Sequence, residues 1–336
     1  MYVSLKNVAA RAGVSFQTAS KVLNGGREGV VSASTRERIL RAAAELGYVP
    51  NAMARGLVRQ ASVTVGVVAD DFSDLAVSQF VLAAQRAAAS RGHAALISSV
   101  HADVDAGLAV RKLLEYRVDG ILVAAPSLED DPALGAALRG PVPVVSINRI
   151  NGAVVPTIGS DHAVTGTLAA EHLLNLGHRR IGTVTGTRTR RVVRARMRGF
   201  ETALRAAGEP LLEHRVAEAD WTFAGGHAAT HRLLDADPTV TAVFVHNDTM
   251  AMGALKALHE RGLRLPADCS VVGCDDLSFA GYLVPPLTTV RIPFQETGER
   301  AATLLVDRIG GKEIPERDLL PVELIVREST SPPGSP

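Results

Sequence analysis

A set of four polar side chains and one aromatic side chain near the N-terminus has the composition of a surface that reads DNA bases. The set is Phe16, Gln17, Ser20, Lys21 and Asn24, and helical spacing places all five on one side of a short helix. In a major groove a glutamine amide pairs with adenine and a lysine ammonium with guanine. A plain helical hairpin whose second helix has a solvated face is the simpler alternative, and these residues alone leave it open.

The neighbouring sequence predicts the elements that would present this face. A first helix has apolar positions at helical spacing, namely Leu5, Val8, Ala9 and Ala12. Gly13 can turn the chain with a positive φ, and Ser15 is a good N-cap for the second helix. The inner side of that helix is small and apolar, with Ala19, Val22 and Leu23. Two short helices, a glycine turn and a polar outer face predict a helix-turn-helix.

A third helix and a linker follow. Ser34 and Glu37 form the pattern of a capping box before an amphipathic run, which Gly47 ends and Pro50 prevents from continuing. We therefore expect a DNA-binding headpiece over residues 1–50. In residues 51–60, Asn51 can cap a short hinge helix, but in isolation so short a helix is mostly unformed. A disordered linker is the alternative when no DNA is bound.

Charge is unevenly distributed along the chain. Residues 1–60 contain nine Lys and Arg against three Asp and Glu, whereas the remainder contains 27 against 32. A basic head on a mildly acidic body suits phosphate contact by the head alone. Cys269 and Cys274 lie in or beside apolar strand patterns and are expected to be reduced. With no signal peptide and no apolar run of transmembrane length, we expect a soluble cytoplasmic protein without a membrane partner.

From residue 61 onward, apolar strands alternate with amphipathic helices. Val63–Val68 is a continuous apolar run, as in a strand buried on both faces, and the strand–helix alternation repeats after residue 180. This pattern predicts an α/β core of two successive doubly wound parallel sheets. Two such lobes imply a cleft between them, and ligands of these sheets bind at the carboxyl ends of strands. The last residues, 329–336, are expected to be a disordered tail.

Several long strings resemble the lac repressor (LacI/GalR) family of bacterial transcription regulators. They are LKNVAARAGVSFQTASKVLN, VSASTRERILRAAAELGYVPNAMARGL, EHLLNLGHRRIG, RARMRGF, VFVHNDTMAMGAL, SVVGCDDL and PPLTTVRIPF. The resemblance covers residues 4–328. The loop NGGREGV is slightly longer than in the family's namesake, which also has Tyr where this chain has Phe16. No leucine heptad follows Arg327, so we expect the namesake's tetramer-forming tail to be absent.

The resemblance implies a headpiece, a hinge helix and a two-lobed core, 61–328, that resembles periplasmic binding proteins and forms a homodimer on a pseudo-palindromic operator. The N-lobe would span about 61–160 and 291–320, and the C-lobe about 161–290 and 321–328. The implied DNA contacts add several residues to the polar face, with Leu57 wedged into the central minor groove. They are Leu5, Ser15, Thr18, Arg36, Asn51, Ala54 and Leu57.

The resemblance also implies an effector cleft. Asn247 and Asp275 follow apolar strands, as the sheet argument requires, and Asn148 ends the strand VVSI at a crossover between lobes. The other expected cleft residues are Arg196, Trp221 and, from a loosely matched loop, Asp74. Charged planar groups can bind paired hydroxyls, and an indole can cover the C–H face of a sugar. Individually these residues have ordinary alternatives, such as a helix N-cap for Asn247 and a surface position for Arg196.

Other candidate motifs do not predict catalysis. His227 and His231 have the i, i+4 spacing of metal ligands but lack the Glu of H-E-x-x-H, so a solvated pair is the preferred interpretation and no metal is expected. The acid pairs at 70–71 and 275–276 have no accompanying nucleophile, and no P-loop, G-x-G-x-x-G or G-x-S-x-G occurs. We therefore expect no enzyme and no cofactor.

The predicted function is a transcriptional regulator, in particular a repressor released by a sugar-like inducer. A corepressor such as a nucleobase, or activation in place of repression, stays open. A transport binding protein is disfavoured by the basic head and by the missing signal peptide.

Overall fold

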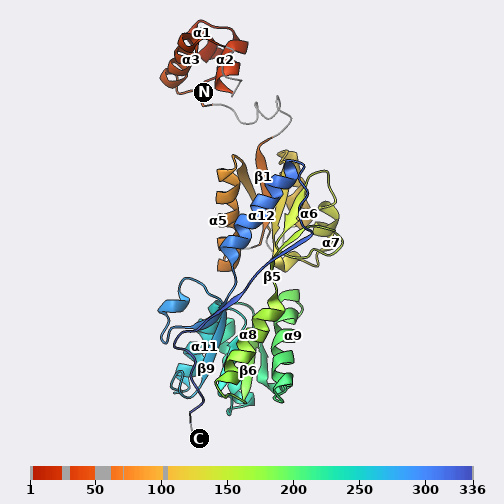
Figure 1. Ribbon diagram of the computed structural model, residues 1–336, viewed down its shortest axis with the longest axis vertical. Coiled ribbons are helices and arrows are strands. Elements are labelled where there is room, and N and C mark those ends of the chain that lie inside the picture. Colours follow the sequence, from red (N-terminus) through yellow and green to blue (C-terminus); the bar gives the residue numbers. More distant parts are fainter. Residues whose placement is uncertain (1–2, 25–30, 50–61, 71, 101–104, 335–336) are drawn as a thin grey trace. The chain divides into compact units, whose positions relative to one another are not determined.

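The structure is a computed structural model that describes residues 3–24, 31–49, 62–70, 72–100 and 105–334. These residues form two compact units, one within 1–64 together with 117–119, the other within 65–116 and 120–336. Each unit is described by itself (Figure 1). The expected hinge residues Asn51, Ala54 and Leu57 lie outside the described residues, as does Asp71.

The described residues of the first unit form three short helices around a small apolar core. The helices are α1 (Leu5–Ala12), α2 (Phe16–Leu23) and α3 (Ala33–Glu45). Val8, Ala19 and Ile39, one from each helix, are fully buried at their centre. Gly13 joins α1 to α2 with φ 63°, and the hydroxyl of Ser15 caps α2 by accepting the Thr18 N–H, as predicted. The helix-turn-helix pattern is therefore confirmed.

The cap of α3 differs from the prediction. The hydroxyl of Ser32, not of Ser34, accepts the backbone N–H of Thr35, and α3 begins at Ala33. The capping-box spacing of Ser34 and Glu37 was therefore misleading. Glu37 instead pairs with Arg41 on the exposed side of the helix, at 3.0 Å. Gly47 does end the helix with a positive φ of 63°.

The second unit contains two six-stranded sheets with the same strand arrangement. The first sheet has the order β11-β5-β4-β3-β1-β2 and the second β12-β10-β9-β8-β6-β7. The strands of the first are β1 (Thr64–Ala69), β2 (Ala94–Ser99), β3 (Gly120–Ala124), β4 (Val144–Ser146), β5 (Thr157–Ser160) and β11 (Arg317–Leu320). Those of the second are β6 (Ile181–Thr185), β7 (Val216–Glu218), β8 (Ala242–Val245), β9 (Ser270–Asp275), β10 (Thr288–Arg291) and β12 (Glu323–Ile325).

In the first sheet the pairs β1–β3, β3–β4, β4–β5 and β5–β11 are parallel. In the second sheet β6–β7, β6–β8, β8–β9 and β9–β10 are parallel and β10–β12 is antiparallel, so the predicted doubly wound α/β core is confirmed. We call the first sheet and its helices the N-lobe and the second sheet and its helices the C-lobe. The chain passes between the lobes after β5, after β10 and after β11, and Figure 1 shows these connections side by side.

Helices cover both faces of each sheet, as continuous apolar strands require. The N-lobe helices are α5 (Leu75–Ser90), α6 (Ala106–Glu115), α7 (Pro132–Ala137) and α12 (Phe294–Ile309). The C-lobe helices are α8 (His162–Asn175), α9 (Arg191–Ala206), α10 (Phe223–Ala236) and α11 (Asp248–Glu260). Successive side chains of β8 point to opposite faces of the sheet. Val243 and Val245 pack in the hydrophobic cluster beneath α10 and α11, whereas Phe244 packs in the cluster beneath α8 and α9.

The end of the chain differs from the expected disordered tail. Ser329 is 1% exposed, and its hydroxyl donates to the carbonyl of Val271 while it accepts the backbone N–H of Thr288. Two residues further on, the backbone of Ser331 contacts Ser270 and His178. The segment is polar and rich in proline, but it satisfies polar groups at the edge of the C-lobe, which composition alone does not reveal.

Two further expectations concern the whole sequence. Cys269 and Cys274 are free and buried, as predicted. None of the helices in the described part of the chain is long and apolar enough to cross a membrane.

Candidate functional site

The predicted base-reading face of α2 divides into exposed and internally bonded residues. Gln17 and Lys21 are exposed, and Phe16 is 50% exposed despite its apolar ring. Ser15 and Thr18 share a hydrogen bond between their hydroxyls at 2.8 Å, and Asn24 donates to Ser20 at 3.0 Å. Gln17 and Lys21 are therefore the long polar side chains that this helix presents freely to solvent.

The remaining described residues of the DNA set lie elsewhere on the headpiece. Arg36 is exposed on the first turn of α3, where a guanidinium can reach a phosphate. Leu5 is half-buried and packs against the headpiece core, so the structure gives it a packing role.

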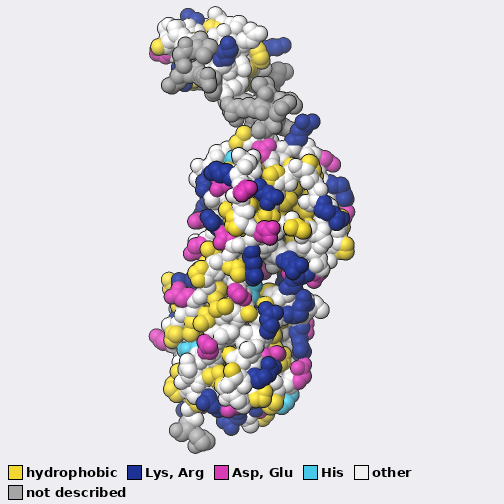
Figure 2. Space-filling view, turned by 45° about the vertical axis from the view of Figure 1, so that its right-hand side comes forward, with side chains coloured by type: hydrophobic (Ala, Val, Ile, Leu, Met, Phe, Trp, Pro, Cys, Tyr) yellow, Lys and Arg dark blue, Asp and Glu magenta, His cyan; other side chains and the backbone are white. Residues whose placement is uncertain are grey.

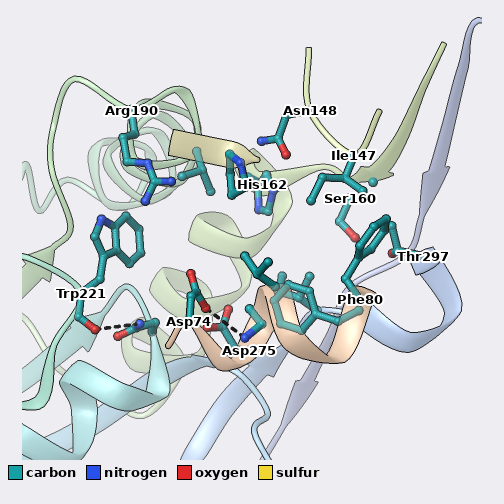
Figure 3. Close-up of a pocket in the computed structure, with 18 of the residues that line it drawn as sticks. Asp74, Phe80, Ile147, Asn148, Ser160, His162, Arg190, Trp221, Asp275 and Thr297 are labelled. Atoms are coloured by element: carbon teal, nitrogen blue, oxygen red, sulfur yellow. Dashed lines mark hydrogen bonds between the residues drawn. The ribbon is translucent and has the colours of Figure 1, made fainter. Parts of the chain in front are cut away.

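All six predicted effector residues line one cleft in the second unit. The cleft encloses about 800 Å³, open solvent included, and Figure 3 shows its lining. The predicted residues that line it are Asp74, Asn148, Arg196, Trp221, Asn247 and Asp275. Asp74 and Asn148 come from the N-lobe and the other four from the C-lobe. A ligand in the cleft can therefore contact both lobes.

Strand ends and helix starts position the polar groups. Asp74 is the N-cap of α5 and accepts the Ala76 N–H at 2.9 Å through one carboxylate oxygen. Asn247 follows β8 and caps α11, accepting the Met250 N–H at 2.7 Å. Its amide nitrogen lies 3.5 Å from the carbonyl oxygen of Trp221. The capping alternative for Asn247 is thus correct, and the same residue also lines the cleft.

Arg196 and Asp275 form a buried charged pair at the floor of the cleft. Both are less than 10% exposed, and an Arg196 nitrogen lies 3.5 Å from an Asp275 oxygen. Arg196 also donates to the carbonyl of His246. Burial raises the pKa of Asp275 and the Arg196 charge opposes that shift. Because the two charges offset each other, the floor offers planar polar groups with little net charge.

The position of Arg196 depends on a close approach between α8 and α9. A Cβ added to Gly166 of α8 would lie 1.9 Å from the backbone carbonyl oxygen of Arg196. Only glycine fits there, so a substitution at Gly166 would push away the turn of α9 that carries the guanidinium.

Trp221 is held in a strained and crowded position. It has φ 73°, and Asp275, also in the C-lobe, has φ 113°, both in a region that side-chain-bearing residues rarely adopt. Such strain clusters at functional sites. A Cβ on Gly186 would lie 2.1 Å from the indole ring, and the guanidinium of Arg190 lies 5.3 Å from the ring centroid. Helix α10 accordingly begins only after this position, at Phe223.

Several lining residues were not predicted. Ser160, His162 and Arg190 carry polar atoms that are buried in the structure and have no hydrogen-bond partner, as do Arg196 and Trp221. Burial, aided by the Arg196 charge, lowers the pKa of His162 to about 3, so its ring is neutral at physiological pH. Ser160 is the last residue of strand β5, which was not predicted because its four residues give only a weak strand signal.

The cleft is flanked by a second contact between the lobes. The Glu129 carboxylate accepts the backbone N–H of Arg191 at 2.7 Å, and the Arg191 side chain contacts Asp130 at 3.0 Å and Asn151 at 2.9 Å. Arg190 lies 3.9 Å from Asp70, which accepts two hydrogen bonds from Ser127. Figure 2 shows basic side chains in a band along this side of the molecule.

A three-helix helix-turn-helix unit and a two-lobed core with a polar cleft define a DNA-binding regulator that binds a small molecule. The comparisons agree. Residues 4–51 match the model of bacterial regulatory proteins of the lacI family, and residues 170–330 match the periplasmic binding protein-like domain. The chain belongs to the lacI family of bacterial regulatory proteins.

The relatives match almost the whole chain. The lactose operon repressor of Escherichia coli K12 is 35% identical over 99% of this chain and 92% of its own length. The transcriptional regulator CelR of Thermobifida fusca is 37% identical over 97% of this chain and 98% of its own length. These relatives are transcriptional regulators rather than enzymes, and the chain is a DNA-binding transcriptional regulator.

Two solved structures extend the comparison to the fold. The lac repressor dimer bound to operator and the anti-inducer ONPF has a TM-score of 0.90 at 34% identity, covering 98% of this chain and 100% of that one. A complex of CelR with cellobiose has a TM-score of 0.75 at 36% identity, covering 97% and 99%.

Proposed function

We propose that the protein is a homodimeric repressor that leaves a pseudo-palindromic operator when a neutral sugar binds in the cleft between its lobes. The observation that carries this proposal is the set of buried polar atoms in the cleft that have no hydrogen-bond partner among the described residues. Such atoms are costly unless a ligand or water satisfies them. The protein would act in the cytoplasm, where the operator DNA is.

The chemistry of the cleft favours a neutral polyhydroxyl compound. Its two arginines, Arg190 and Arg196, are balanced by Asp74 and Asp275, and His162 is neutral. The amide of Asn148 adds both a donor and an acceptor. Hydroxyl groups can donate to carboxylates and accept from guanidinium groups in the same site. The relative CelR is known in complex with cellobiose, a compound of this kind.

The arrangement of aromatic groups refines the role of Trp221. Because Gly186 and Arg190 crowd the indole, it is not an open platform in this conformation. We propose that a sugar either displaces the Arg190 guanidinium from the ring or binds along the ring edge, where the indole N–H lacks a partner.

We assign a separate role to each of the predicted domains. The headpiece, residues 1–50, would read the operator through Gln17 and Lys21, and residues 51–60 would connect it to the core, with Leu57 contacting the minor groove. The core, residues 61–328, would bind the effector and dimerise. An apolar surface supports dimerisation, since Tyr282 and Val284 of the C-lobe are 88% and 90% exposed.

The direction in which a bound ligand changes operator affinity distinguishes the proposal from its alternatives. A sugar inducer weakens operator binding, whereas a corepressor strengthens it. A ligand can shift the equilibrium only by its differential affinity for the two arrangements of the lobes. The relatives named as repressors favour repression over activation.

Thermal unfolding of the full-length protein against panels of neutral mono- and disaccharides and of nucleobases tests the proposal. A ligand at 100 times its dissociation constant stabilises the core by about 2.7 kcal/mol. The expected result is a stabilising sugar that also reduces operator binding in a mobility-shift assay. Asn148→Ala should lower the affinity for that sugar, whereas Arg139→Ala, outside the cleft lining, should not. Stabilisation by a nucleobase alone, with stronger operator binding, would contradict the proposal.

A further inference from the structure

His227 and His231 have a third partner that the sequence conceals. They lie one turn apart on α10, and their rings meet edge to face with centroids 4.7 Å apart. The carboxylate of Glu260, at the end of α11, faces both rings. One of its oxygens, Oε2, lies 2.6 Å from Nε2 of His227 and 3.3 Å from Nε2 of His231. The carboxylate missing between the histidines is therefore supplied by the neighbouring helix.

We propose that His227, His231 and Glu260 form a binding site for a divalent transition metal ion, with Zn²⁺ as the reference ion. Two imidazole nitrogens and one carboxylate oxygen are a donor set that suits zinc and its neighbours, whereas Mg²⁺ and Ca²⁺ prefer oxygen ligands alone. Among the residues that the structure describes, this is the one group of three such side chains whose ligand atoms all lie within 4.8 Å of one another.

The geometry needs little adjustment to accept an ion. Ligands about 2.0–2.2 Å from a tetrahedral zinc lie roughly 3.3 Å apart. The distances between Glu260 Oε2 and the two ring nitrogens already bracket that value. The three side chains are 29–39% exposed, so an ion can enter from solvent and water can complete its coordination.

The electrostatics of the carboxylate are favourable. Hydrogen bonds from Lys256 and the two histidines lower the pKa of Glu260 to about 2, so it is ionised at any working pH. Lys256 Nζ contacts the other carboxylate oxygen, Oε1, at 2.5 Å and leaves Oε2 facing the rings. Metal binding through the two Nε2 atoms requires that neither carries a proton.

One neighbour opposes metal binding. The Nε–H of Arg261 donates to Nδ1 of His231 at 3.0 Å, which places the ring proton of a neutral His231 on Nε2. A metal on Nε2 requires the other tautomer, so Arg261 must release the ring. It keeps two acceptors nearby, the His231 carbonyl at 3.1 Å and the Asp235 carboxylate at 2.5 Å. Removing Arg261 should therefore strengthen the site.

The site would join the two helices that begin at the effector cleft. Trp221 lies two residues before the start of α10, and Asn247 caps α11. The metal would link the middle of α10, at His227 and His231, to the C-terminal end of α11, at Glu260, and so stabilise the C-lobe. This inference does not rest on the identity of the effector.

Isothermal titration with Zn²⁺, and the visible absorption of bound Co²⁺, test the site in full-length protein without an affinity tag. We expect one Zn²⁺ per chain and a rise in the unfolding midpoint. His231→Ala and Glu260→Gln should each weaken Zn²⁺ binding by about tenfold or more, because each removes one of three ligands. Arg261→Met should tighten it several-fold.

His259→Ala is the matched control, since His259 neighbours Glu260, is exposed and lies outside the cluster. It should leave the affinity for Zn²⁺ unchanged within a factor of about two, and operator binding by each variant shows that it is folded. The proposal is overturned if the wild-type protein binds no Zn²⁺ at concentrations up to about 100 µM, since a dissociation constant above that value would be too weak for a specific site. It is also overturned if His259→Ala weakens binding as much as His231→Ala does.

Discussion

At the scale of single residues, Gln17 offers the sharpest test of operator recognition. Its side chain is exposed on α2 and free of the internal hydrogen bonds that hold Ser15, Thr18 and Ser20. Gln17→Ala should cost about 1–3 kcal/mol on the correct operator and little on random DNA. Arg36→Ala, which removes an expected phosphate contact, should weaken both equally. Fluorescence anisotropy with the two DNAs distinguishes these outcomes, and equal loss for Gln17→Ala would make it a backbone contact.

Arg196 has a structural role in addition to its expected contact with the effector. Arg196→Ala leaves the Asp275 carboxylate buried without its counter-charge, which costs about 3–5 kcal/mol of unfolding free energy. The double variant Arg196→Ala with Asp275→Asn should recover much of that loss, because the orphaned charge is gone. Both variants should bind operator below their melting temperatures but fail to respond to the effector.

Urea unfolding of the two variants measures the stability difference, and calorimetry measures effector binding. If the double variant were less stable than the single one, the buried charge would not be the source of the cost. Normal effector affinity in either variant would remove Arg196 from the site.

At the scale of elements, the first residue of α11 is expected to make stability depend on pH. Asp248 is fully buried, accepting from Thr289 at 2.6 Å and from the Leu277 N–H at 2.8 Å, and burial raises its pKa to about 7. Between about pH 4 and pH 7 the folded state holds a proton that the unfolded state has lost. The contribution of Asp248 to the free energy of unfolding is therefore greatest below pH 4 and declines as the pH rises to about 7.

Asp248→Asn should remove this contribution to the dependence of the free energy of unfolding on pH. Relative to wild type, the variant should gain stability progressively between pH 4 and pH 7, by up to a few kcal/mol, and then stay level. Urea denaturation of both proteins across that range provides the measurement. Parallel curves for the two proteins would show that Asp248 does not titrate there.

The start of α9 is a second element with a specific expectation. Arg191 connects the C-lobe to Glu129, Asp130 and Asn151 of the N-lobe. Arg191→Ala should loosen the angle between the lobes and lower effector affinity by about 1 kcal/mol, a factor of about five. Arg194→Ala on the same helix is the control, because the Arg194 guanidinium donates to the Thr189 carbonyl within the C-lobe. Equal effects of the two substitutions in calorimetry would contradict this role.

Sequence patterns predicted the elements with strong periodicity and missed those defined by tertiary contacts. The apolar run at β1 and the helix-turn-helix of α1 and α2 follow from hydrophobic spacing and one glycine. Strand β5 has only four residues, and the cap of α3 depended on which serine reached an N–H. The partnership of Glu260 with His227 requires two helices to be packed side by side, which spacing along one helix does not show.

Only some of the residues that line the cleft could be predicted from the sequence. Residues at strand ends, such as Asn247 and Asp275, could be predicted because parallel strands present their carboxyl ends together. Arg190 and His162 could not, because each stands at the start of a C-lobe helix, α9 and α8 respectively, and its place in the cleft depends on how those helices pack. The Arg190 contact with Trp221 lies within the C-lobe, between positions far apart in sequence, and it changes what the indole can offer a ligand.

At the scale of the whole molecule, operator affinity should depend on dimerisation through the C-lobe. Tyr282 and Val284 are almost fully exposed, and Leu255, Leu263 and Leu283 line a groove beside Val284. An apolar surface of this kind on a soluble protein marks an interaction site, and a second copy of the chain satisfies the symmetry of a pseudo-palindromic operator. Each half-site alone would hold one headpiece weakly.

Val284→Asp places a carboxylate in that surface, where pairing with a second copy would desolvate it. Because the side chain is exposed in the monomer, the substitution should leave the fold and effector affinity unchanged while shifting sedimentation from dimer to monomer at micromolar concentration. Operator affinity should then fall by about 100-fold or more, since the two headpieces no longer bind as one unit. Val326→Asp, at another exposed apolar position, is the control and should stay dimeric. A Val284→Asp protein that sediments as a dimer and binds operator normally would place the dimer interface elsewhere on the chain.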